Sequence, residues 1–212
     1  EGCIVKGYWI NHVVEIKDRD KFFAYASASE SMFTGDNKYG ALMKVFGPVS
    51  ATIKGDAVSH DALGEFNSIQ AAIDFWHDPD YAATRAHLGP LDDESSTVER
   101  RVCCIEAEEI AISPNQWFWL NHVSEIRDEE AFFKYANASL GNFNVAAFGP
   151  VVHQHAGSQR IQLAAALGFT SEDMALNVRG TESYKSALAE GGMVDGESHV
   201  VSRTICALPA TS

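Results

Sequence analysis

The chain has 212 residues, and its 16 Lys and Arg against 29 Asp and Glu give a net charge of −13 at pH 7. A nucleic-acid-binding protein needs a basic surface that neutralises phosphates, so this charge argues against nucleic acid and against an anionic membrane surface as partners. No apolar run approaches the roughly 20 residues that span a bilayer, and the composition is that of a soluble globular protein.

The first half of the chain begins with a predicted strand and helix. Residues 6–16 are rich in aromatic and β-branched side chains, which is typical of a strand. Asp18 follows in the position of a helix N-cap, and from Phe22 onward apolar residues recur at i, i+3, i+4 and i+7, the spacing of an amphipathic helix. Residues 41–54 predict a second strand, interrupted at Gly47-Pro48 because proline cannot donate a hydrogen bond to a sheet ladder.

The rest of the first half completes the order β-α-β-β-α-β. Residues 57–66 predict a third strand, and Ser68 is placed to cap a second helix. Pro79 is expected to open a short helical continuation through Tyr81, since proline is favoured at the first helical position. Residues 97–106 predict the closing strand.

The second half repeats the first. Residues 118–139 match residues 8–29 at a constant offset of 110, and 13 of these 22 positions are identical. Further along, the offset shortens to 102, at which the Phe-Gly-Pro-Val sequence of residues 46–49 returns at 148–151. An internal repeat of this kind predicts two copies of one module, at residues 1–110 and 111–212.

The same offset of 102 matches residues of the two closing strands. A linker is predicted between the two modules. The offset matches Arg101 with Arg203 and Cys104 with Cys206. Residues 113–115 read Ser-Pro-Asn and predict the linker.

The predicted fold class is α+β, with two tandem ferredoxin-like modules. In a β-α-β-β-α-β module both helices cover one face of a four-stranded antiparallel sheet, and the other face is left bare. Two copies in one chain can bury both bare faces against each other. We therefore expect an intramolecular dimeric α/β barrel, a pseudo-dimer within a monomer.

Two stretches of the first module carry a family resemblance. Residues 7–13 read GYWINHV and are followed by Asp18 and Tyr25, and residues 65–81 read EFNSIQAAIDFWHDPDY. Together they resemble the domain-of-unknown-function family numbered 1330, in the dimeric α/β-barrel superfamily, over most of residues 6–106. The resemblance implies this fold and a homodimer-like barrel, and it implies no particular reaction.

The second module departs from that resemblance after its opening. Arg179 stands where the first module has Trp76, and residues 180–184 lack the proline of the first module. We expect the second module to keep the fold while its site has diverged.

The first strand supplies the main candidate site residues. Its side chains alternate between two faces, and the more apolar set, with Tyr8 and Ile10, is expected to pack under the helices. The more polar set would then line the barrel interior, where an aromatic wall with a few polar groups suits a small-molecule ligand. The candidate ligand-binding residues are Trp9, Tyr81, Arg101, Trp119, Asn121 and His122, and the candidate catalytic residues are His12 and Asn11. Tryptophan packing between the modules and a hydrogen-bonded core histidine are the alternative interpretations.

Further charged and metal-ligating residues leave alternatives open. Arg101 and Arg203 could clamp a carboxylate ligand or form structural salt bridges with Glu15 and Glu125. His153 and His155 share one strand face with the spacing of two metal ligands, but a third ligand is not apparent, so we predict a solvent-facing edge strand and no metal. The acidic residues 92–94 predict a solvated loop.

The four cysteines, at positions 3, 103, 104 and 206, are too few for a disulfide framework and predict free thiols. No phosphate-binding loop or nucleophile elbow appears, and no cofactor is predicted. The sequence begins at Glu1 rather than Met, which is consistent with processing of a longer precursor, and the compartment stays open.

Two functional classes follow from these observations. The first is a small-molecule binder with its ligand in the barrel interior, with or without cofactor-independent enzyme activity. The second is a non-catalytic accessory subunit whose acidic surface binds other proteins.

Overall fold

The structure, a computed structural model, describes residues 4–90, 95–113 and 115–211. Cys3, the acidic residues 92–94 and Pro114 of the predicted linker lie outside the described residues. The first half contains β1 (Val5–Ile16), α1 (Arg19–Glu30), β2 (Leu42–Pro48), β3 (Ala51–Lys54), β4 (His60–Phe66), α2 (Ile69–Trp76), α3 (Pro79–Arg85), η1 (Ala86–Leu88) and β5 (Val98–Glu108). The second half contains β6 (Trp117–Ile126), α4 (Glu129–Ser139), η2 (Leu140–Asn142), β7 (Val145–Pro150), β8 (His153–Ala156), β9 (Leu163–Phe169), α5 (Glu172–Asn177), η3 (Val178–Gly180), α6 (Glu182–Glu190) and β10 (Val201–Pro209).

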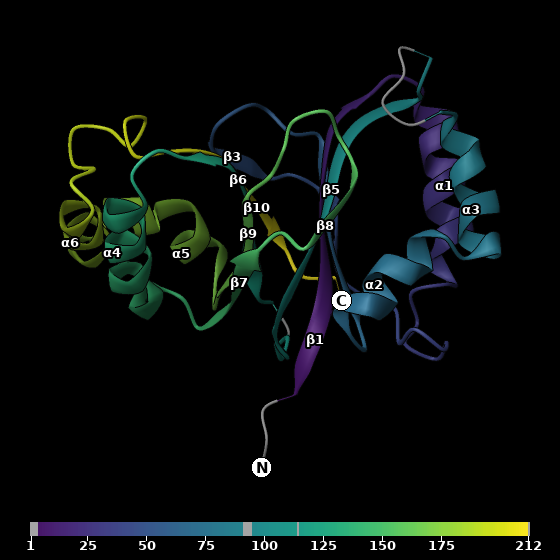
Figure 1. The fold of residues 1–212 in the computed structure, drawn as a ribbon, viewed down its shortest axis with the longest axis horizontal. Helices are drawn as coiled ribbons and strands as arrows, with labels where there is room; N and C mark the ends of the chain where they lie inside the picture. The colour runs from purple at the N-terminus through teal and green to yellow at the C-terminus, as the bar shows by residue number, and fades with distance from the viewer. Residues whose placement is uncertain (1–3, 91–94, 114, 212) are drawn as a thin grey trace.

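Two five-stranded antiparallel sheets form the centre of the molecule, in the orders β2-β4-β1-β5-β8 and β3-β10-β6-β9-β7. Helices α1 to α3 lie on one side of the paired sheets and α4 to α6 on the opposite side (Figure 1). The mixed α+β class predicted from the sequence is therefore confirmed. The strands form two separate hydrogen-bonded sheets and not one closed barrel.

The two halves exchange an edge strand. β3 of the first half pairs with β10, and β8 of the second half pairs with β5. The prediction of one interrupted strand over residues 41–54 is wrong for this reason, because the chain leaves the first sheet after Pro48 and enters the second at Ala51. The Ser50 amide donates to the Ala207 carbonyl at 2.9 Å, so the crossing is held by the opposite half.

The helix starts are confirmed. The Asp18 side chain accepts from the Lys21 amide at 3.1 Å and the Ser68 hydroxyl accepts from the Ala71 amide at 3.1 Å, which satisfies backbone donors that have no partner within the helix. Pro79 is the first residue of α3. Among the described residues, no helix is long and apolar enough to cross a membrane.

The two faces of β1 are the reverse of the prediction. Tyr8, Ile10 and His12 are fully buried, and the first two belong to the apolar layer packed between the two sheets. Trp9 and Val13 instead pack under the helices of the first half. Both faces of this sheet are covered, one by the helices of the first half and the other by a layer of buried apolar side chains from both sheets.

The strand register also corrects the predicted match between the closing strands. Arg100 lies opposite Val13 on β1, and Arg203 lies opposite the equivalent Val123 on β6. The structural offset here is 103 residues, so Arg203 corresponds to Arg100 and not to Arg101. By the same register Cys206, opposite Leu120, corresponds to Cys103, opposite Ile10.

Candidate ligand-binding site

A cavity of about 660 Å³ lies in the first half, between α1 and the helix-facing surface of β1, β2 and β4. Most of its lining is aromatic or aliphatic, and the C-terminal segment adds Thr211 at one side. Its lining residues are Trp9, Asn11, Val13, Phe22, Phe23, Tyr25, Ala26, Ser27, Ser29, Glu30, Phe33, Thr34, Met43, Phe46, Ala62, Gly64, Tyr81 and Thr211. The structure thus brings together three predicted site residues, Trp9, Asn11 and Tyr81, beneath the helices and not between the sheets.

The aromatic wall of the cavity is built around Trp9. Its indole nitrogen donates to the Ala72 carbonyl at 2.7 Å, which fixes the orientation of the ring. The ring centroid lies 4.8 Å from that of Phe66 and 5.4 Å from that of Phe75, within the range of favourable aromatic contact. A wall held in this way presents a rigid apolar surface to a ligand.

An amide and a pair of tyrosine hydroxyls are the main polar groups at the cavity. The Asn11 Oδ1 atom is buried and makes no hydrogen bond to any described residue. The hydroxyl oxygens of Tyr25 and Tyr81 are 2.6 Å apart, and Arg100 donates to the Tyr25 hydroxyl at 3.2 Å from behind the wall. Burial raises the pKa of Tyr81 well above its usual value, so this phenol is neutral at physiological pH. The site therefore offers a free amide acceptor and a hydrogen-bonded pair of tyrosine hydroxyls.

The equivalent region of the second half is nearly closed. Its cavity is about 40 Å³ and is lined by residues equivalent to those above, among them Asn121, Phe132 and Tyr135. Gly64 lies opposite Trp9 in the first sheet, and Leu167 lies opposite Trp119 in the second. The Leu167 side chain lines the small cavity, whereas Gly64 at the equivalent position of the first half has no side chain. Asn121 Oδ1 also makes no hydrogen bond to the part of the chain that the structure describes, but the space there suits little more than water.

The arginine behind the second-half pocket forms a buried ion pair. Arg203 contacts both carboxylate oxygens of Glu197, at 3.1 and 2.7 Å, and donates to the Tyr135 hydroxyl at 3.0 Å. The predicted bridge between Arg203 and Glu125 is therefore wrong, and Glu125 pairs with Arg127. Arg101 is placed level with His12 in the strand register, away from the cavity.

His12 and His122 lie between the sheets. Their ring centroids are 3.8 Å apart, and the His12 Nδ1 atom is 2.8 Å from an Asp61 carboxylate oxygen. Burial lowers the pKa of His12 to about 3, so the ring stays neutral near pH 7. The two candidate catalytic residues are therefore separated, because Asn11 faces the cavity and His12 faces the opposite side of β1.

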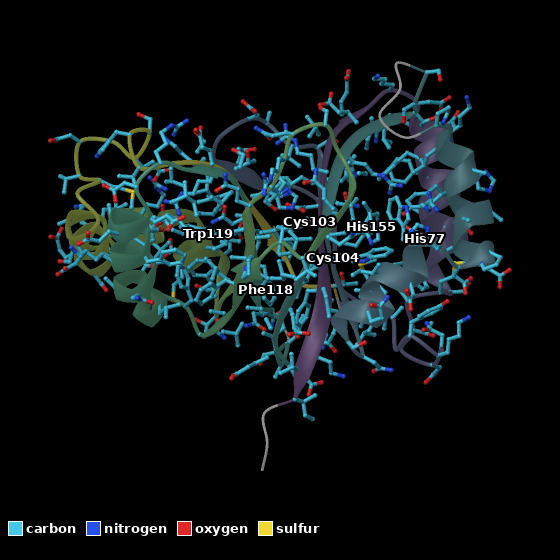
Figure 2. The ribbon with its side chains drawn as sticks, in the orientation of Figure 1. His77, Cys103, Cys104, Phe118, Trp119 and His155 are labelled. Atoms are coloured by element: carbon cyan, nitrogen blue, oxygen red, sulfur yellow. The ribbon has the colours of Figure 1, made fainter. Side chains whose placement is uncertain are left out.

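His155 of β8 packs against the first half. Its ring stacks on Trp76 with the centroids 4.5 Å apart and an interplanar angle of 6°. β8 is an edge strand of its sheet, as predicted, but His155 packs against Trp76 and does not face solvent as expected. Figure 2 shows His155 and His77 on the side of the first-half helices, whereas His199 lines a different surface pocket beside α4.

We expect His155 to make stability depend on pH. Burial, and then the nearby His153, lower the pKa of His155 to about 3, so below about pH 6.5 the unfolded chain binds a proton that the folded chain does not. The contribution of the neutral His155 ring to folding stability is therefore present above pH 6.5 and is lost as the pH falls towards 3. The free energy of unfolding, measured with urea, should fall between pH 6.5 and 4.5 more steeply in wild type than in His155→Gln. The difference in slope should be up to ~1.4 kcal/mol per pH unit, and less where solvent reaches the ring. Parallel slopes would contradict this expectation.

Comparison with known proteins agrees with the first-module resemblance. Residues 6–99 match the family described as "Domain of unknown function (DUF1330)", which confirms the resemblance predicted from residues 7–13 and 65–81. Among curated sequences, none matches the chain significantly.

Solved structures resemble the whole chain in fold. A "putative monooxygenase" from Fusobacterium nucleatum has a TM-score of 0.59 at 11% identity, covering 100% of this chain and 94% of its own. An anthrone oxidase-like protein has a TM-score of 0.59 at 9% identity, covering 98% and 92%. A "putative monooxygenase" from Lactobacillus acidophilus has a TM-score of 0.53 at 13% identity, covering 98% and 94%. At these identities the similarity shows the fold alone.

Proposed function

We propose that the first-half cavity binds a planar, largely apolar small molecule that carries at least one hydroxyl group. The observation that carries the proposal is the unpartnered Asn11 Oδ1 atom in an aromatic cavity of about 660 Å³. Cavities of about 300–1,000 Å³ with apolar walls and a few placed polar groups are typical of small-molecule sites. A buried acceptor without a partner costs about 1–3 kcal/mol, which a ligand hydroxyl would recover by donating to it.

The aromatic lining of the cavity supports an aromatic ligand over a flexible chain. Trp9, Phe33 and Tyr81 belong to one cluster of ring contacts, so their faces and edges can contact a flat molecule without rearrangement. The hydroxyl pair of Tyr25 and Tyr81 could orient a second oxygen of the ligand. Because the aromatic wall is already formed and rigid before a ligand binds, the entropic cost of binding is lower.

We further propose that bound ligand is oxidised there by molecular oxygen without a cofactor. The support is an analogy of fold with neighbours described as a "putative monooxygenase" or as anthrone oxidase-like. For a substrate with an activated methylene, the step is R₂CH₂ + O₂ → R₂C=O + H₂O, in which one oxygen atom enters the substrate and the other leaves as water with its two hydrogens. Asn11 and the tyrosine pair would orient the substrate in this reaction.

We infer that the two halves are diverged copies of one ferredoxin-like module, joined as a pseudo-dimer. Each half places a strand, a helix and three further strands in the same order, and one of those three strands pairs at the edge of the other half's sheet. In this proposal the ligand binds in the first half, and the second half, with its cavity of about 40 Å³, has a structural role. An accessory role alone would leave the larger cavity without a ligand.

Asn11→Leu is expected to weaken binding of 1-naphthol by about 10-fold, the equivalent of ~1.4 kcal/mol for one lost hydrogen bond. Binding of naphthalene, which has no hydroxyl, should be unchanged or tighter. Quenching of tryptophan fluorescence during titration measures both affinities, and Asn121→Leu in the second half is the matched control. An equal loss for naphthol and naphthalene would show that Asn11 supports the wall and does not bind the hydroxyl. Oxygen uptake with anthrone as substrate tests the oxidase activity separately.

A further inference from the structure

A second cluster of reactive groups lies between the two sheets, on the opposite face of β1 from the cavity. It contains His12 of β1, Asp61 of β4 and Cys206 of β10, so it joins both sheets and both halves of the chain. One ligand atom from each of these residues lies within 4.8 Å of the others, and all three side chains are fully buried. Figure 2 shows Cys103, on the neighbouring strand β5, at the centre of the molecule.

The fold alone does not require these groups. Asp61 lies opposite His12 in the first sheet, and the equivalent residue opposite His122 in the second sheet is Ala164. A methyl group therefore satisfies the packing in one half, whereas the other half buries a carboxyl. The Asp61 carboxyl contacts His12 Nδ1 at 2.8 Å and accepts from the Ala62 amide at 3.0 Å, and a bound cation would stabilise its buried charge further.

The cluster also contains nitrogen atoms without a hydrogen bond. His12 Nε2 and His122 Nδ1 are buried and have no partner among the described residues. The ring centroids of His122 and His12 are 3.8 Å apart, and the Nε2 atom of His122 is 3.1 Å from the Ile10 carbonyl oxygen. Unpartnered imidazole nitrogens in a fully buried setting are available to bind a metal ion.

The donor set and its charge fit a divalent metal ion. Imidazole nitrogen, carboxylate oxygen and thiolate sulfur bind Zn²⁺ at about 2.0–2.3 Å, which separates tetrahedral ligand atoms by about 3.4 Å. The ligand atoms of the observed cluster all lie within 4.8 Å of one another, so small side-chain adjustments would bring them to this spacing. A divalent ion with one carboxylate and one thiolate forms a neutral complex, so the cost of burying each charge is offset.

We propose that His12, Asp61 and Cys206 bind one divalent first-row transition-metal ion, best fitted by Zn²⁺, between the two sheets. His122, whose ring centroid lies 3.8 Å from that of His12, is a candidate for a fourth ligand. The site is structural, since it lies on the far side of β1 from the ligand cavity and links strands of both halves.

The test is to unfold the full-length protein in urea with a chelator, refold it with Zn²⁺ or Co²⁺, and remove unbound metal. We expect about one Zn²⁺ per chain by elemental analysis and a thiolate-to-cobalt charge-transfer band in the Co²⁺ form. Cys206→Ser should lose the band and reduce bound metal to below about 0.1 per chain. The control Cys104→Ser should keep both, because Cys104 belongs to the core on the helix side of the sheet.

Two outcomes would overturn the proposal. The first is refolded wild-type protein without stoichiometric metal or a cobalt–thiolate band. The second is a band that survives in Cys206→Ser. If that variant does not fold, X-ray absorption of the zinc-loaded wild type decides, since one sulfur and two or three nitrogen or oxygen neighbours are expected, and none or several sulfurs would contradict the site.

Discussion

Gly64→Leu is expected to weaken binding of 1-naphthol to the first-half cavity by at least about 100-fold, equivalent to ~2.7 kcal/mol. A Cβ atom added at Gly64 would lie 3.4 Å from the Phe66 ring and 3.5 Å from the Phe33 ring, which is ordinary contact. The rest of a leucine side chain would then extend into the cavity and fill it, as Leu167 lines the small cavity of the second half. The fold should be retained, because the equivalent strand already carries leucine.

The binding measurement is again a fluorescence titration, with circular dichroism and the urea midpoint as checks of folding. Gly141→Leu is the control, since an added Cβ at Gly141 meets nothing within 4 Å. It should bind 1-naphthol as wild type does. A folded Gly64→Leu protein with wild-type affinity would show that naphthol binds somewhere other than this cavity.

Glu197→Ala is expected to lower the free energy of unfolding by about 3–5 kcal/mol, because it leaves the Arg203 charge buried and without its partner. Both side chains of this pair are 3% exposed. Although burial alone would raise the pKa of Glu197, the hydrogen bonds and charge of Arg203 lower it below its usual value, so the carboxylate is ionised. The mutation therefore removes a charged partner and not a neutral acid.

Urea unfolding at pH 7 measures this change, and the double variant Glu197→Ala with Arg203→Met should recover part of the loss. The control is Glu125→Ala, whose partner Arg127 lies at the surface, with exposed fractions of 53% and 38%. That control should cost less than about 1 kcal/mol. Equal losses for Glu197→Ala and Glu125→Ala would mean that the buried pair does not stabilise the second half.

Local features of the fold could be predicted from the sequence. The caps at Asp18 and Ser68 and the proline at the start of α3 each act through the nearest backbone groups, and all three are observed. The crossing at Pro48 could not be predicted in the same way. The partner of β3 is β10, some 150 residues further along the chain, and only the assembled sheets determine that pairing.

The assignment of faces failed because hydrophobicity alone cannot order two buried layers. Tyr8 and Ile10 are more apolar than Asn11, but both faces of β1 are covered, one by helices and one by the second sheet. The match of Arg101 with Arg203 failed by one residue, because the offset between the halves changes from 102 to 103 before the closing strands.

The candidate site was predicted in part. Trp9, Asn11 and Tyr81 do line one cavity, whereas His12 and His122 lie in the layer between the sheets. Gly64 was missed, because a site made by an absent side chain gives no signal within one module. Aligning the two halves, where Gly64 stands against Leu167, was the comparison that could have identified it.

A crystal structure of the protein soaked with 1-naphthol tests the central claim most directly. The proposal predicts density for one naphthol beneath α1, with its ring against Trp9 and its hydroxyl within about 3 Å of the Asn11 Oδ1 atom. A ligand bound in the second-half pocket or only on the surface, with the first-half cavity holding water alone, would contradict it.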